Sequence, residues 1–126
     1  ARHVIGIEPS AELVAGARKR LAAYDRQRID LVAAPLEAGC PPHQPYDRII
    51  LEGAVREVPQ ALEQQLREGG TLVAIRALGA SFATKKMLGP IVVGRKHGTH
   101  VSYVEKTHVC AYPLTLGQNN GKEFVL

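Results

Sequence analysis

Tryptophan is absent from the sequence, methionine occurs once, and aromatic residues make up only 5% of the 126 positions. Cysteine is also scarce, since the chain holds only Cys40 and Cys110, far apart in the sequence. A disulfide between them is conceivable, but a chain of this size can bury enough core to fold without one. Such sparse cysteine use predicts a protein of the reducing cytoplasm.

No apolar run approaches the roughly 18 residues that a membrane-spanning helix needs. Residues 1–7 are too short in their apolar part, and lack the cleavage pattern, to be read as a signal peptide. Hydrophobic residues make up 45% of the chain and charged residues 22%, which is typical of folded globular proteins. The composition therefore predicts that residues 1–126 form one globular domain that is folded and has no membrane partner.

The first part of the chain has the pattern of a strand, a helix and a second strand. Residues 3–7 form a short run rich in β-branched side chains, typical of a buried parallel strand. Ser10 then stands where a helix N-cap is expected, and apolar residues recur at helical spacing from Leu13 to Tyr24. Residues 29–33 are a second apolar run.

The pattern repeats further along the chain. Residues 46–51 read as a third strand ended by Glu52 and Gly53. A helix is then expected from Pro59 to Gly69-Gly70, followed by a fourth strand over residues 71–75. Alternating strands and helices predict an α/β fold built on a parallel sheet with crossover helices.

After Gly79 the pattern changes to an antiparallel hairpin. Residues 87–95 and 100–110 flank a turn at residues 96–99, in which Gly98 supplies the positive φ. We therefore expect two antiparallel strands at one edge of an otherwise parallel sheet, and a C-terminal run at 124–126 that packs against it.

Glu8 is the most informative polar residue, because ligands of open α/β sheets bind beyond the carboxyl ends of the strands. A carboxylate directly at a strand end can accept hydrogen bonds from both hydroxyls of a ribose. The competing interpretation is that Glu8 is only solvated, or stabilises the N-terminus of the next helix. The pattern alone leaves both open.

Three blocks of sequence resemble the protein-L-isoaspartate O-methyltransferases. Residues 4–13 (VIGIEPSAEL) are similar to their second-strand segment, and residues 45–50 (PYDRII) to their fourth strand. Residues 57–62 and 65–73 (EVPQAL, QLREGGTLV) resemble their helix-to-strand passage. The resemblance implies a three-layer Rossmann-like methyltransferase sheet, mostly parallel with an antiparallel C-terminal hairpin.

The resemblance also implies an activity and a set of contacts. The methyl donor would be S-adenosylmethionine, and the partner a protein or peptide carrying an isoaspartyl carboxylate, as in protein repair. Glu8 corresponds to the ribose ligand and Leu36 lies close to the adenine-binding segment. Glu52 and Gly53 would lie near the donor methyl group or the methionine moiety. The resemblance assigns no catalytic residue.

Two departures from the family pattern bear on this expectation. The family's first strand, its glycine-rich loop and the substrate-binding segment upstream have no counterpart, so we expect this chain alone to be inactive. Ala34-Pro35 also replaces a Gly-Asp pair, and Pro35 can neither accept through its side chain nor donate a backbone N–H. Because a missing strand leaves exposed sheet edges, we expect a dimer or pairing with a missing N-terminal segment.

Two alternatives concern other chemistry. Cys40, His43, His108 and Cys110 could in principle ligate zinc, but their spacing is atypical and we expect no metal. A dinucleotide oxidoreductase needs the same absent glycine fingerprint.

The last alternative is a non-catalytic binding or dimerisation module with a basic face. In residues 71–110 Glu105 is the only acidic residue, against six basic ones: Arg76, Lys85, Lys86, Arg95, Lys96 and Lys106. Such a face would suit an acidic protein. Aromatic side chains are not interleaved with these cations, which argues against nucleic acid as a partner.

Overall fold

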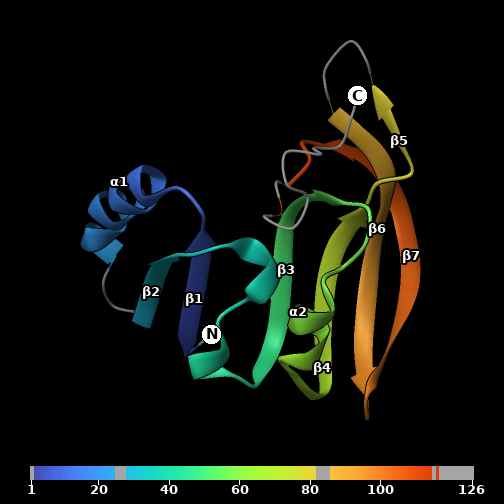
Figure 1. Ribbon diagram of the computed structural model, residues 1–126, viewed down its shortest axis with the longest axis horizontal. Helices are drawn as coiled ribbons and strands as arrows, with labels where there is room; N and C mark the ends of the chain where they lie inside the picture. Colours follow the sequence, from blue (N-terminus) through green and yellow to red (C-terminus); the bar gives the residue numbers. More distant parts are fainter. Residues whose placement is uncertain (1, 25–27, 82–85, 115, 117–126) are drawn as a thin grey trace.

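The computed structural model describes residues 2–24, 28–81, 86–114 and 116, so the expectation for residues 124–126 lies outside the described residues. The chain forms an α/β fold, shown in Figure 1. The strands are β1 (His3–Glu8), β2 (Arg28–Ala33), β3 (Tyr46–Val55), β4 (Leu66–Arg76), β5 (Gly79–Ser81), β6 (Lys86–His97) and β7 (His100–Ala111). The α-helices are α1 (Ala11–Leu21) and α2 (Gln60–Gln64), and short 3-10 helices form η1 (Ala22–Tyr24), η2 (Leu36–Ala38) and η3 (Pro41–His43).

The first strand–helix–strand unit forms as the sequence predicts. β1 and β2 pair in parallel from His3 opposite Arg28 to Glu8 opposite Ala33. The predicted cap is confirmed, since the Ser10 hydroxyl accepts the Leu13 N–H at 3.2 Å. This unit therefore places the carboxyl ends of β1 and β2 side by side.

The second sheet has the strand order β3-β4-β6-β5, with β7 paired to β6. β3 and β4 are parallel, whereas all pairs made by β6 are antiparallel. The predicted hairpin is confirmed: β6 and β7 meet at His97 opposite His100, and Gly98 has a φ of +62°.

Two predicted boundaries were wrong. β3 does not end at Glu52-Gly53 but continues to Val55, after an irregularity in its pairing with β4 between Ile50 and Ala54. The expected helix from Pro59 to Gly69 is only the five-residue α2, and β4 begins at Leu66. The reason is tertiary: the Gln65 carbonyl accepts the Tyr46 N–H at 2.8 Å, which starts sheet pairing where the helical spacing would continue.

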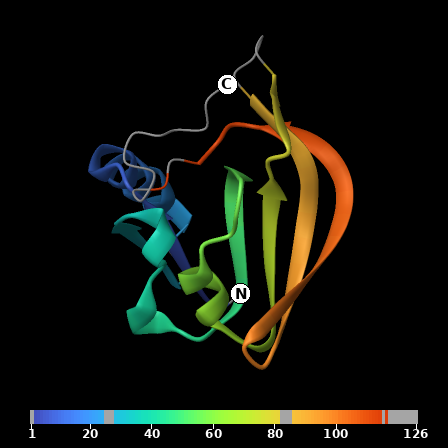
Figure 2. The same cartoon turned by 45° about the vertical axis from the view of Figure 1, so that its right-hand side comes forward.

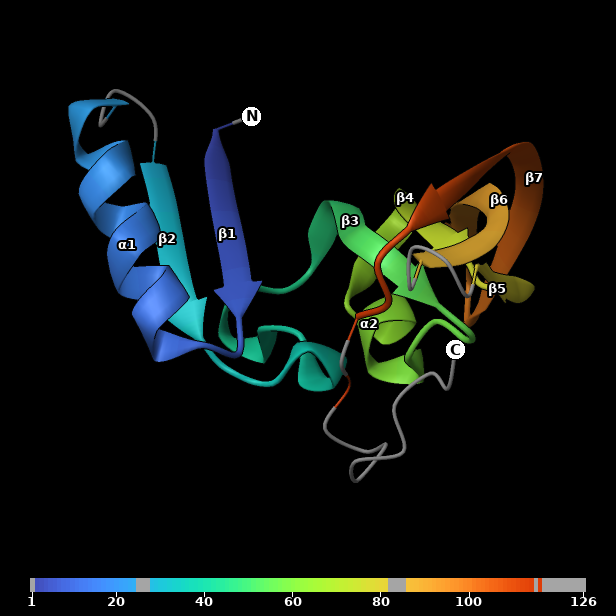
Figure 3. The same ribbon diagram turned by 90° about the horizontal axis from the view of Figure 1, so that it is seen from above.

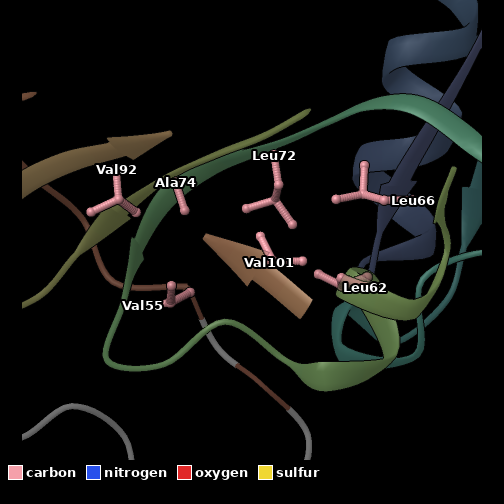
Figure 4. Close-up of a cluster of buried hydrophobic side chains, with 7 residues drawn as sticks. All are labelled: Val55, Leu62, Leu66, Leu72, Ala74, Val92 and Val101. Carbon is pink, nitrogen blue, oxygen red and sulfur yellow. The ribbon is translucent and has the colours of Figure 1, made fainter. Parts of the chain in front are cut away.

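The main core lies between the β3-β4-β6-β7 sheet and α2 (Figure 4). Leu72 of β4 and Val92 of β6 are fully buried, and Leu62 of α2 reaches the same cluster. Its buried members are Val55, Leu62, Leu66, Leu72, Ala74, Val92 and Val101. Because β3, β4, β6 and β7 all contribute to one apolar cluster, this sheet is the stable body of the chain.

In the residues that the structure describes, the predicted sheet is present as two hydrogen-bonded parts. Figures 1 and 3 both show β1 between β2 and β3, yet the pairing stops there. Across residues 2–24, 28–81, 86–114 and 116 no hydrogen-bonded strand pair joins β1 to β3. β1 and β3 therefore form the facing edges of the two sheets.

The chain after β7 returns over the end of the sheet (Figure 2). There the Ala54 N–H donates to the Tyr112 carbonyl and the Leu114 N–H donates to the Ala54 carbonyl, both at 2.9 Å. The Leu114 side chain then covers Gly53, where a Cβ would lie 2.5 Å from Leu114 Cδ2. This packing leaves no room for a side chain at position 53.

We expect Gly53→Ala to destabilise the chain by about 1–3 kcal/mol, because the new methyl group overpacks against Leu114. Combining it with Leu114→Ala should recover part of that loss, and urea unfolding followed by circular dichroism measures both. Gly79→Ala is the control, since a Cβ at Gly79 meets nothing within 4 Å. Strict additivity of the Gly53 and Leu114 changes would contradict the contact.

Candidate functional site

Glu8 stands at the carboxyl end of β1, half-buried and directly before the helix N-cap. Its Oε1 accepts the Ser10 N–H at 3.1 Å, and its backbone carbonyl accepts the Ala34 N–H at 3.2 Å. The Glu8 carboxylate makes no other protein hydrogen bond within the described part of the chain. The structure thus supports the helix-stabilising interpretation of Glu8 and leaves its second oxygen available to a ligand.

Leu36 lies close to Glu8 along the fold because β2 ends beside β1. Ala33 is the partner of Glu8 in the parallel ladder, and Leu36 begins η2 three residues later. The intervening Pro35 is extended, with φ −57° and ψ 141°. The structure therefore brings Glu8 and Leu36 to the same end of one small sheet.

Glu52 and Gly53 belong to the other sheet. Glu52 is exposed on β3, whereas Gly53 is buried beneath Leu114. Both precede the true end of β3 at Val55, so they are not the strand-end residues that the sequence suggested. A role for them beside the donor methyl group stays a prediction.

Gln65 is a residue that the sequence analysis missed. Its side chain is only 4% exposed, yet it is polar and fully paired. Oε1 accepts the Cys40 N–H at 3.0 Å, and Nε2 donates to the Ala38 carbonyl at 2.7 Å. Two signals were available in the sequence: Gln65 lies three residues after Leu62, on the apolar side of the predicted helix, and it falls in the QLREGGTLV block.

The cysteine and histidine candidates for a metal are not brought together. Cys40 is buried before η3 and Cys110 is exposed on β7, and both are free thiols. Within residues 2–24, 28–81, 86–114 and 116 no group of three or more His, Cys, Asp and Glu side chains could hold a metal ion. Neither helix in the same part of the chain has the length and apolar character of a membrane-spanning segment.

The basic half of the chain is partly occupied by internal contacts. Arg76 pairs with Glu105 at 3.2 Å, and Lys96 donates to the Gln64 carbonyl at 3.1 Å. Lys86 lies 5.2 Å from the centre of the Tyr112 ring. Lys85 falls outside the described residues. Since these cations have partners within the fold, the basic face is weaker than the sequence suggested.

Two curated relatives are similar to this chain, and both are named protein-L-isoaspartate O-methyltransferase. The one from Ignicoccus hospitalis is 41% identical over 71 residues, covering 56% of this chain and 34% of its own length. The one from Thermococcus sibiricus is 32% identical over 126 residues, covering 97% of this chain and 53% of its own length. The chain thus spans between a third and about half of the relatives that it matches.

Two solved structures share the fold. A protein-L-isoaspartate O-methyltransferase aligns with a TM-score of 0.77 and 21% identity, over 90% of this chain and 34% of that one. A Plasmodium falciparum structure assigned to the same activity, in complex with S-adenosyl-L-homocysteine, aligns with a TM-score of 0.70 and 16% identity, over 90% of this chain and 52% of that one. These alignments establish the Rossmann-like methyltransferase fold that the resemblance implied.

A comparison with a whole family agrees with these pairs. The model of the family described as Protein-L-isoaspartate(D-aspartate) O-methyltransferase matches residues 1–115, which include every strand and helix from β1 to β7. By fold and by sequence, this chain belongs to the protein-L-isoaspartate(D-aspartate) O-methyltransferase family.

Proposed function

We propose that this chain is the cofactor-binding portion of an S-adenosylmethionine-dependent protein-L-isoaspartate O-methyltransferase, an enzyme of protein repair. The observation that carries the proposal is Glu8 at the end of β1, oriented by the Ser10 N–H at 3.1 Å and adjacent to the Leu36 loop. Family membership over residues 1–115 supports the same activity.

Glu8 would hold the ribose of the cofactor, and the fold favours this role in two ways. The Ser10 N–H binds one carboxylate oxygen and so orients the group, while the half-buried position reduces screening by water. Hydrogen bonds from ribose hydroxyls to a carboxylate are roughly twice as strong as bonds between neutral groups. Leu36 would supply apolar contact to the adenine, and Pro35 offers no acceptor for its amino group.

S-adenosylmethionine, when bound, supplies an electrophilic methyl group for the carboxylate of an isoaspartyl residue. The acceptor is already ionised, so the protein needs no general base and acts by holding the two reactants in line. Such alignment is worth roughly 7–11 kcal/mol in favourable cases. Glu52 and Gly53, near the end of β3, are our candidates for the methionine end of the cofactor.

The facing edges of β1 and β3 carry backbone N–H and C=O groups that a further strand could pair with. We propose that a strand from an N-terminal segment of the protein pairs with them, or that a second copy does so when that segment is absent. The free Cys40 and Cys110 support our assignment to the reducing cytoplasm.

We expect the chain to bind S-adenosylhomocysteine near the micromolar range, about −8 kcal/mol, when titrated by calorimetry. Glu8→Gln should weaken binding about tenfold, because it replaces the charged acceptor of the ribose hydroxyls. Glu12→Gln is the matched control: it removes the same charge from an exposed site in the first turn of α1. Absence of binding, or an equal loss in both variants, would contradict the proposed site and favour the non-catalytic module.

We also expect the isolated chain to self-associate, because β1 and β3 present unpaired backbone groups. Sedimentation velocity over a range of concentrations measures this, with a larger sedimentation coefficient at higher concentration as the expected result. A concentration-independent monomer would show that these edges need no partner.

A further inference from the structure

Gln65 is the only polar or charged residue among the buried residues of the described chain. Burying an amide is costly unless its donor and acceptor are both paired, and here both are. The partners are not in the same element: Gln65 follows α2, whereas Ala38 and Cys40 belong to the loop that follows β2. The side chain therefore ties the second half of the fold to the loop that begins with Leu36.

The two bonds together require a side chain that both accepts and donates, as an amide does. The Cys40 N–H needs an acceptor at 3.0 Å, and the Ala38 carbonyl needs a donor at 2.7 Å. A carboxylate would only accept and an ammonium group would only donate. Methionine, of similar length, would do neither, so the loop itself specifies the side chain at position 65.

Gly39, between these two bonds, shows how closely the loop approaches Gln65. Its φ is +63°, a conformation that favours glycine, and a Cβ there would lie 2.8 Å from Leu62 Cδ2 and closer still to Gln65 Oε1. The Gly39 N–H also donates to the Leu36 carbonyl at 3.2 Å. Holding residues 38–40 in place therefore also restrains Leu36, which is one turn of η2 away.

Tyr46, at the start of β3, binds the same loop, and we call the side chains of Gln65 and Tyr46 together the clamp. Its hydroxyl donates to the Cys40 carbonyl at 2.6 Å, and its backbone N–H donates to the Gln65 carbonyl at 2.8 Å. Burial, followed by the hydrogen bond to Cys40, raises the pKa of Tyr46 to about 12. The phenol therefore stays a donor throughout the neutral range.

We infer that Gln65 is a positioning residue for the cofactor: its amide holds the Leu36–Cys40 loop in the conformation that presents Leu36 to the adenine. This inference rests on the proposed function, in which Leu36 contacts the adenine at the nucleoside end of the site. Gln65 itself acts only through the loop, to which its side-chain amide is bonded.

The test compares two ligands that differ only in the presence of the base, S-adenosylhomocysteine and S-ribosylhomocysteine, titrated against the 126-residue chain. Gln65→Met should weaken S-adenosylhomocysteine binding about tenfold, from the loss of two buried hydrogen bonds that order the loop. S-Ribosylhomocysteine, which lacks the adenine, should lose less, so the preference for adenine should shrink. The ratio of the two affinities does not depend on the fraction of folded protein, because that fraction scales both affinities equally.

Val92→Ala is the control for general destabilisation. Val92 is fully buried in the core on β6, away from the loop, so its truncation should lower stability while leaving the preference for adenine unchanged. Hydrogen exchange gives a second readout: in Gln65→Met the Cys40 N–H should exchange faster while the core amides of β4 keep their protection.

If Gln65→Met fails to fold, Tyr46→Phe loosens the same loop by removing only the hydroxyl bond to Cys40, with an expected loss of about threefold in affinity. Unchanged adenine preference in a folded clamp variant, or a change equal to that of Val92→Ala, overturns the positioning role while leaving the proposed function intact. Absence of binding by the wild-type chain overturns both.

Discussion

The parallel pairing of β3 with β4 is the contact on which the rest of this structure depends. Parallel strands cannot be joined by a tight turn, so residues between them must cross over, and α2 is the short crossover that does so. The pairing begins at the bond between the Tyr46 N–H and the Gln65 carbonyl. From that point β4 carries Leu72 into the core, where β6 packs against it.

The same contact links core and candidate site. Once Gln65 is fixed by backbone pairing, its side chain is directed at the loop after β2. The Tyr103 hydroxyl donates to Glu63 Oε2 at 2.6 Å, which fastens the short α2 to the hairpin. Burial and this bond raise the pKa of Tyr103, so the contact persists at neutral pH. A five-residue helix is stable here through tertiary contacts, since its own length is too small to sustain it.

Local patterns predicted the elements whose determinants are local. The Ser10 cap, the β1 and β2 runs and the Gly98 turn each depend on a few neighbouring residues, and all are confirmed. The end of β3 and the length of α2 depend instead on partners distant in sequence. Ala54 is held in a strand by Tyr112 and Leu114, and Leu66 begins β4 because β3 is already beside it. The helical spacing of apolar residues in the sequence carries no information about such contacts.

The candidate site divides along the same line. The place of Glu8 at a strand end could be predicted from sequence, because the apolar run before it and the Ser10 cap after it are local, whereas its role toward a ribose stays a prediction. The role of Gln65 could not be found in this way: its spacing from Leu62 places it on the apolar side of the predicted helix, but spacing does not show which groups its amide binds. The sequence signal for a buried polar side chain lies in its partners, Ala38 and Cys40, which only the fold brings near.

The division of the sheet separates two tasks that a methyltransferase must combine. Glu8 and Leu36 belong to the β1-β2 sheet, whereas Glu52 and Gly53 belong to the larger one. Under the proposed function, holding a nucleoside would need the first group together with the Gln65 clamp, which already joins it to the larger sheet. Aligning donor and acceptor would need both groups at a fixed distance, and most of the roughly 7–11 kcal/mol available from alignment would be lost if the two sheets could shift. Cofactor binding would therefore depend less than methyl transfer on a strand that joins β1 to β3.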